Sequence, residues 1–221
     1  MKTNIQEAKQ GRRFLACTLT IVLMLSGCVS KGRVETGDLL FVGLPMDYSL
    51  KSDTTIDKEE GINYIHTAIL EVDENDDIWV IDATLKHGVD RHPLDTFLRD
   101  FTLRDGSLPS LEVLRLKDNS NARYYVEQAK AFLGEPYDCD FSADNGKHYC
   151  TELVYDSYIQ DGKHLFSIGP MDWENKNGHI PAYWTQLFSI IGSDVPQGVE
   201  GTNPATMYNE PVLRKINTQL K

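Results

Sequence analysis

The chain has 221 residues, with 22 Lys and Arg against 33 Asp and Glu, which gives a formal net charge of −11 at neutral pH. A surface of this sign repels the phosphates of nucleic acids, so we expect no nucleic acid partner. The length fits a single domain with a sizeable core, and no internal repeat or domain-length linker divides the sequence.

The first residues have the features of an export signal. Arg12-Arg13 precede an apolar run over residues 14–25 that is too short to remain as a membrane helix, and the run closes on Leu25-Ser26-Gly27-Cys28. This pattern resembles a bacterial lipoprotein signal, which implies cleavage before Cys28 and acylation of its sulfur and amine. A plain secretory signal is the alternative.

Removal of this segment leaves 18 Lys and Arg against 32 Asp and Glu, a net charge of −14. We therefore expect the membrane contact to be made by acyl chains on Cys28 and not by a basic patch. The resulting division is a signal peptide over residues 1–27, a tether over 28–36, and one domain with a C-terminal extension over 37–221. The expected location is the bacterial cell envelope, with the lipid-anchored domain in the periplasm or at the cell surface.

The first half of the domain predicts a sheet. Leu39-Leu40-Phe41-Val42 is a compact apolar run typical of a buried strand, and the polar residues 46–61 predict a loop long enough to border a cleft. Residues 65–72 and 78–84 are rich in strand-forming side chains. They flank the polar cluster over residues 73–77, which predicts a β-hairpin.

Two polar side chains interrupt the apolar faces of this hairpin. Because side chains alternate along a strand, a turn centred on Glu74 puts His66 directly opposite Asp82. A turn centred on Asn75 makes His66 and Asp82 diagonal neighbours, still about 5–8 Å apart at Cβ. In both registers an imidazole meets a carboxylate. A core histidine bonded to a core aspartate is the structural alternative.

Further elements follow the hairpin. Residues 111–116 predict a strand, and residues 163–180 look irregular. Helices are predicted to start at Pro93, after the cap Ser120-Asn121, and at Pro181. The residues expected to face the core from these helices are Leu94, Phe97, Leu98, Phe101, Ala122, Val126, Ala129, Leu133, Trp184, Leu187, Phe188 and Ile191. The Pro- and Gly-rich residues 195–204 have no helical period, and we expect them to be ordered by draping over the domain.

A cysteine stands at the start of another short amphipathic helix. After Cys150, the apolar positions Leu153, Val154 and Tyr158 recur at helical spacing, and Asp161-Gly162 supplies a stop. At a helix N-terminus the partial positive charge of the free N–H groups favours thiolate, and the same groups can hold a developing oxyanion. These are the requirements of a cysteine nucleophile. A small buried core residue is the alternative.

The second cysteine of the domain is Cys139. Two cysteines in an exported protein commonly form a disulfide, and the separation of Cys139 from Cys150 allows one. The position of Cys150 at a helix start and its upstream polar partners suit an unpaired thiol better.

A thiol, an imidazole and a carboxylate are the parts of a nucleophile, a base and an orienting group. Their chain order here is His66, Asp82, Cys150, opposite to the cysteine-first order of ordinary papain-like enzymes. With the segments around them, the sequence resembles the circularly permuted papain-like hydrolases of the NlpC type, in particular YiiX-like proteins. The matching segments are Thr36–Val42, Ile65–Ile69, Trp79–Ala83, Phe132–Asp138 and Tyr149–Val154.

The resemblance implies an α+β fold in which an antiparallel sheet packs against helices and the nucleophile lies at a helix N-terminus. It implies Cys150 as nucleophile, His66 as base, and Asp82 at a third position where relatives more often carry Glu. We interpret Glu152, which is also in the matched segment, as structural support, because two residues past Cys150 a helical side chain points away from the thiol.

Three further residues are candidates for contact with substrate. Tyr64 and Tyr149 border the proposed site, although aromatic residues at such positions often serve in packing. Asn145, five residues before Cys150, is a candidate for the oxyanion contact that a Gln makes in papain.

We therefore expect a cysteine hydrolase that cleaves an amide bond through a thioester, in a short peptide such as a cell-wall (peptidoglycan) fragment. We expect no cofactor and no metal. The same permuted fold resembles lecithin retinol acyltransferase and related phospholipid acyltransferases, so lipid acyl hydrolysis or transfer is the enzymatic alternative. Those relatives favour a second His about a dozen residues after the first, where this chain has Ile78, and this difference favours peptides.

Two alternatives from other classes are also open. A non-catalytic, membrane-anchored binding domain would keep the fold without the chemistry. A metal-binding module would use the closely spaced His87, Asp90 and His92. We place these three residues in a solvated loop that leads to a helix.

Overall fold

The computed structural model describes residues 32–51, 58–143, 145–218 and 220. The predicted signal peptide and the lipidation site Cys28 lie outside these ranges. Within them, no helix has the length and apolar character needed to cross a bilayer.

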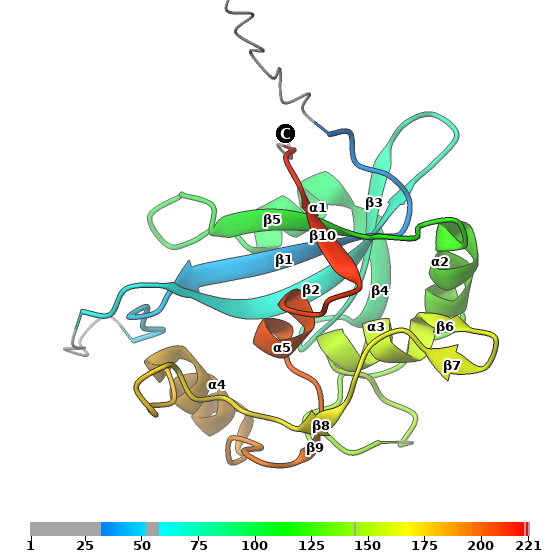
Figure 1. Ribbon diagram of the computed structural model, residues 1–221. Coiled ribbons are helices and arrows are strands. Elements are labelled where there is room, and N and C mark those ends of the chain that lie inside the picture. The colour runs from blue at the N-terminus through cyan, green and yellow to red at the C-terminus, as the bar shows by residue number, and fades with distance from the viewer. Residues whose placement is uncertain (1–31, 52–57, 144, 219, 221) are drawn as a thin grey trace, which may run out of the picture.

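One six-stranded antiparallel sheet organises the fold, with strand order β10-β5-β1-β2-β3-β4 (Figure 1). Two short strand pairs, β6 with β7 and β8 with β9, lie outside it. The strands of the main sheet are β1 (Asp38–Pro45), β2 (Ile62–Val72), β3 (Ile78–Thr84), β4 (Gly88–Pro93), β5 (Ser110–Leu116) and β10 (Leu213–Ile216). The short strands are β6 (Ile159–Gln160), β7 (Lys163–His164), β8 (Gly169–Pro170) and β9 (Glu200–Gly201).

Helices cover both faces of this sheet. The helices of the described residues are α1 (Leu94–Asp100), α2 (Ala122–Lys130), α3 (Cys150–Ser157), α4 (Ala182–Ile191) and α5 (Pro204–Tyr208). Residues of α2, α3 and α5 pack on the face that contains Leu39 and Phe41. Helix α1 packs on the opposite face, beside Leu40 and Val42. Strand β1 is thus buried on both sides, which explains its unbroken apolar run. The antiparallel sheet with helices packed against it confirms the predicted α+β fold.

The β2–β3 hairpin has the second of the two predicted registers. Ile69 pairs with Ile81 and Leu70 with Val80, so the turn is centred on Asn75. The carboxylate of Asp73 fixes this turn, since its Oδ1 accepts the backbone N–H of Asn75 at 2.8 Å. His66 and Asp82 are therefore diagonal and not directly opposite.

Three predicted features are wrong. The segment from His87 to His92 is not a solvated loop, because Gly88–Pro93 forms β4 and pairs with β3. Leu133 does not face the core, because α2 ends at Lys130 and Leu133 is 40% exposed. The cysteine helix ends at Ser157, before the predicted stop Asp161-Gly162.

Strand β4 is polar, and its pairing depends on contacts remote in sequence. Gly88 has φ +67°, and a Cβ at this position would lie 2.2 Å from the carbonyl oxygen of Glu135. The N–H of Val89 donates to that same carbonyl at 2.8 Å. A glycine is therefore required where the backbone of residues 134–136 approaches the start of β4.

The C-terminal residues lie over the domain as predicted. Strand β9 pairs with β8, and β10 completes the main sheet beside β5. The hydroxyl of Thr151 donates to the carbonyl of Thr202 at 2.7 Å. The extension is thereby fastened to the first turn of α3.

Candidate active site

The imidazole of His66 and the carboxylate of Asp82 form a buried hydrogen bond. His66 Nε2 lies 2.7 Å from Asp82 Oδ2, and the two residues are 7% and 1% exposed. Phe97 and Phe101, from α1 and its C-terminal end, pack near the imidazole, with ring centroids 6.1 and 4.9 Å away. Since Nε2 donates to Asp82, Nδ1 is the ring nitrogen left to take a proton from another group.

Cys150 is the first residue of α3, and it lines the same cavity as His66. Burial lowers the pKa of His66, but the negative charge of Cys150 and hydrogen bonds to Asp82 and Cys150 raise it to about 10 overall. The raised pKa favours the imidazolium, which is the partner that stabilises a thiolate. The structure therefore brings together the three residues that the sequence proposes as a triad.

The cavity at Cys150 has a volume of about 140 Å³ and mainly aromatic walls. None of the described residues that line it is Asp, Glu, Lys or Arg. Besides Cys150 and His66, they are Ile65, Ala83, Thr84, Leu85, Phe101, Tyr137, Phe141, Tyr149, Trp173, Tyr183, Trp184, Leu187 and Pro204. Burial and the nearby Cys150 raise the pKa of Tyr137 and of Tyr183, so both phenols stay protonated at neutral pH.

Of the three predicted substrate contacts, only Tyr149 lies in this cavity. Tyr64 instead stacks on Tyr208, with ring centroids 3.9 Å apart, and lines a neighbouring hollow. Asn145 lines another hollow beside His148, and its Oδ1 accepts the N–H of Lys147 at 3.0 Å. The side chain of Asn145 is used in its own turn, so the structure does not place it as an oxyanion contact for Cys150.

Glu152 lies away from the thiol cavity. Its Oε2 accepts the backbone N–H of Tyr149 at 3.4 Å, and its side chain lines the two hollows on the far side of the helix start. Burial raises the pKa of Glu152 to about 7. This placement fits the predicted structural role.

Sequence reasoning did not find the aromatic walls. Trp184 and Leu187 were expected only in the core, and Tyr137, Trp173 and Tyr183 had no assigned role. These residues come from segments that are distant from Cys150 in the chain. A periodic pattern within one segment therefore cannot predict that they lie beside Cys150. The one available signal is the density of aromatic residues between positions 173 and 188.

The disulfide and metal alternatives find no support in the described residues. Cys139 and Cys150 are both free thiols. Among the residues in the described ranges, no group of three or more His, Cys, Asp and Glu side chains is arranged to hold a metal ion. His87 turns toward Asp100, 3.4 Å away, whereas His92 faces Asp82.

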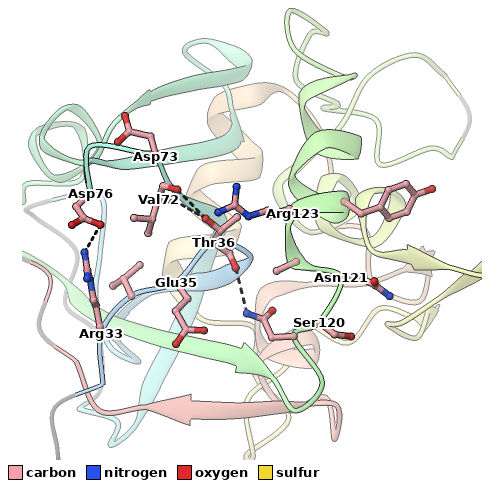
Figure 2. Close-up of a pocket in the computed structure, with 13 residues that line it drawn as sticks. Arg33, Glu35, Thr36, Val72, Asp73, Asp76, Ser120, Asn121 and Arg123 are labelled. Carbon is pink, nitrogen blue, oxygen red and sulfur yellow. Dashed lines mark hydrogen bonds and ion pairs between the residues drawn. The ribbon is translucent and has the colours of Figure 1, made fainter.

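A larger hollow, of about 640 Å³, opens at the start of β1 and α2 (Figure 2). Arg33 and Asp76 form an ion pair at its rim, and the hydroxyl of Thr36 donates to the carbonyl of Val72. It shares no lining residue with the thiol cavity. Its charges are of both signs and partly paired with one another, so it is separate from the proposed chemistry.

Comparison with known proteins identifies the fold and the family. The chain is similar in fold to the crystal structure of metalloprotein yiiX from Escherichia coli O157:H7, with a TM-score of 0.58 and 22% identity. The similarity covers 86% of this chain and 100% of that one. No curated protein matches the chain. A family model described as permuted papain-like amidase enzyme, YaeF/YiiX, C92 family, matches residues 33–217. The chain therefore belongs to the permuted papain-like amidases of the YaeF/YiiX type, a family of cysteine peptidases and amidases.

Proposed function

We propose that this protein cleaves an amide bond in a short peptide, with Cys150 as the nucleophile, His66 as the general base and Asp82 as the orienting group. The observation that carries the proposal is the shared cavity of Cys150 and His66, with the 2.7 Å bond from His66 Nε2 to Asp82 behind it. Covalent catalysis requires a nucleophile beside a base, with a carboxylate that holds the base in its orientation.

The reaction follows from the positions of these groups. Nδ1 of His66 holds the thiol proton in an imidazolium–thiolate pair, and the sulfur of Cys150 attacks the amide carbon. The oxygen then carries the negative charge, which the N–H groups at the start of α3 can stabilise. His66 gives its proton to the leaving amine, so a thioester forms. Water, deprotonated by His66, hydrolyses that thioester and restores the thiol.

The cavity suggests which part of the substrate lies beside the scissile bond. Because the described residues of its walls are mainly aromatic and include no Asp, Glu, Lys or Arg, a charged side chain would lose hydration there without gaining an ionic partner from them. We therefore propose a neutral or apolar group on the acyl side of the amide. Peptides derived from the cell wall are the proposed source, with their charged groups outside this cavity.

The aromatic walls also favour one competing activity. An acyl chain of a lipid would fit apolar walls as well as a neutral peptide side chain does, so lipid acyl hydrolysis or transfer is the second candidate. The test is to incubate the purified domain with cell-wall peptides and, separately, with phospholipid vesicles. Release of a peptide amine by the wild type, and none by Cys150→Ala, supports the proposal. Release of fatty acid without peptide cleavage replaces it with the lipid activity.

We also propose that the protein is a lipoprotein of the bacterial cell envelope, anchored through Cys28. The support is the sequence pattern that ends at Leu25-Ser26-Gly27-Cys28. Mass spectrometry of the N-terminal peptide from the native host should show a diacylglyceryl group on Cys28, and Cys28→Ala should move the protein out of the membrane fraction. An unmodified Cys28 in the mature protein would contradict the anchor and leave the hydrolase proposal intact.

A further inference from the structure

One oxygen of the proposed orienting carboxylate has no hydrogen-bond partner. Asp82 is 1% exposed, and its Oδ2 accepts from His66. Its Oδ1 is fully buried, and no described residue donates a hydrogen bond to it. A buried carboxylate oxygen without a donor is costly, because its hydration is lost without replacement. We therefore expect a nearby group of the fold to replace the lost hydration of Asp82 Oδ1.

A second histidine lies close to this oxygen. His92 lies on β4, beside β3 at the edge of the sheet (Figure 1), and is 8% exposed. Its Nε2 is 3.8 Å from Asp82 Oδ1, and its Nδ1 is 3.6 Å from Asp90 Oδ2. The ring lies nearly parallel to Phe97, with an interplanar angle of 16°. Packing thus orients the imidazole so that each nitrogen faces one carboxylate.

The strand register explains why a positive or donating group is needed there. Asp82 on β3 is directly opposite Asp90 on β4, whereas Val80 is opposite His92. Like charges directly opposite one another in an antiparallel pair destabilise it. The ring of His92 lies between these two carboxylates, 3.8 Å from Asp82 Oδ1 and 3.6 Å from Asp90 Oδ2, so an N–H on it faces a carboxylate oxygen. A movement of about 1 Å would shorten the contact from Nε2 to Asp82 to a hydrogen bond.

We propose that His92 is a positioning residue, which donates Nε2–H to Asp82 Oδ1 and so holds the carboxylate in the orientation that accepts from His66. The inference rests on the proposed function, since it assigns a role within the same site. Without this donor the carboxyl group of Asp82 is free to rotate, because its terminal torsion has a broad, two-fold preference. The bond that fixes the tautomer of His66 is then weakened.

The test uses alkylation of Cys150 by iodoacetamide, which needs no substrate. The rate is measured from pH 5 to 9 in wild type, His92→Phe and His92→Gln. The Phe variant keeps a flat ring against Phe97 but has no donor, so we expect the thiolate midpoint to move upward by about one pH unit, a roughly tenfold slower reaction below that midpoint. The Gln variant keeps a donor, and we expect it to react much more like wild type than the Phe variant does.

His87→Phe is the matched control. His87 lies near His92, with ring centroids 6.4 Å apart, but it is directed to Asp100 and should leave the profile unchanged. In an Asp82→Asn background, His92→Phe should add nothing further, because its effect passes through Asp82. A folded His92→Phe variant with the wild-type profile would overturn the inference, and so would an equal additional loss in the Asp82→Asn background.

A measurement on the unmodified protein covers the case in which His92→Phe does not fold. Long-range ¹H–¹⁵N spectra of labelled histidines report which ring nitrogens carry protons. We expect a proton on Nε2 of His92, and a ring protonated only on Nδ1 would overturn the inference. Failure of the proposed function is distinguishable from failure of this inference. It would appear as the absence of amide cleavage, independently of the alkylation profile of Cys150 and of the tautomer of His92.

Discussion

His66 Nε2 reaches Asp82 Oδ2 at 2.7 Å although the two residues are diagonal, not opposite, in the β2–β3 hairpin. Extending the register of the hairpin places Ala68 across from Asp82, and Ala68 is fully buried with a small side chain. No bulky group therefore separates the imidazole from the carboxylate. This diagonal contact lets a short Asp orient the histidine.

The first prediction concerns this bond. Asp82→Asn keeps the size of the side chain but removes the carboxylate that stabilises the imidazolium and selects its tautomer. We expect kcat/KM for the amide substrate to fall by a factor of about 10²–10⁴ with little change in fold. Steady-state kinetics with a melting curve for each protein checks this. Turnover within twofold of wild type would show that Asp82 does not orient the base.

The second prediction concerns the reactivity of Cys150 at low pH. The pKa of His66 is raised to about 10, so the imidazolium persists through the neutral range, and it lines the same cavity as the Cys150 thiol, where a positive charge favours thiolate. In a Cys139→Ser background, iodoacetamide should label Cys150 at pH 6 faster than it labels free cysteine. His66→Ala should abolish the advantage. Labelling no faster than free cysteine would favour a non-catalytic binding domain.

The third prediction concerns Glu152 and stability. Burial raises its pKa from 4.5 to about 7, so the folded state holds the proton more tightly than the unfolded state does. Its contribution to stability is therefore lost as pH rises from about 4.5 to about 7. Glu152→Gln does not titrate and keeps an acceptor for the N–H of Tyr149.

We expect Glu152→Gln to be more stable than wild type by about 1–3 kcal/mol above pH 7, with the difference vanishing below about pH 4.5. Urea unfolding of both proteins at pH 4.5, 6 and 8 measures this difference. A stability difference that does not vary with pH would show that the carboxyl group is not buried in its neutral form.

The fourth prediction concerns the C-terminal extension. A Cβ on Gly201 would lie 2.7 Å from the hydroxyl of Tyr149 and 3.2 Å from Met171. Gly201→Ala should therefore shift Tyr149, which directly precedes Cys150, and cost about 1–3 kcal/mol of stability. We expect slower alkylation of Cys150 as well.

Gly169 provides the matched control, because it pairs with Gly201 across β8 and β9 and no described atom lies within 4 Å of its Cβ position. Gly169→Ala should leave the melting temperature and the alkylation rate nearly unchanged. Equal effects of the two substitutions would mean that the strand pair, and not the contact with Tyr149, is responsible.

Local patterns were sufficient to predict the elements that hold the three proposed catalytic residues. The run Leu39–Val42 is apolar because β1 is buried on both faces, and α3 begins at Cys150 as expected. The register of the hairpin was limited to two choices. The choice between them depends on the carboxylate of Asp73, which accepts backbone N–H groups of the turn.

The rest of the site depends on contacts between distant segments. Strand β4 has a polar sequence, so neither its existence nor the approach of His92 to Asp82 follows from an apolar period. The aromatic walls come from α4, from Trp173 before it, from the end of α1, and from the segment that leads into α3. The predicted substrate contacts Tyr64 and Asn145, which lie outside the cavity, were chosen because they are close to His66 and Cys150 in the chain. Closeness in the chain does not determine the direction in which a side chain points.

The most direct measurement of the central claim is mass spectrometry of the protein after rapid acid quenching during turnover of an amide substrate. If Cys150 is the nucleophile, the peptide that contains it carries the acyl part of the substrate as a thioester, and Cys150→Ala shows neither this adduct nor turnover while it stays folded. Undiminished amide cleavage by Cys150→Ala would contradict the account.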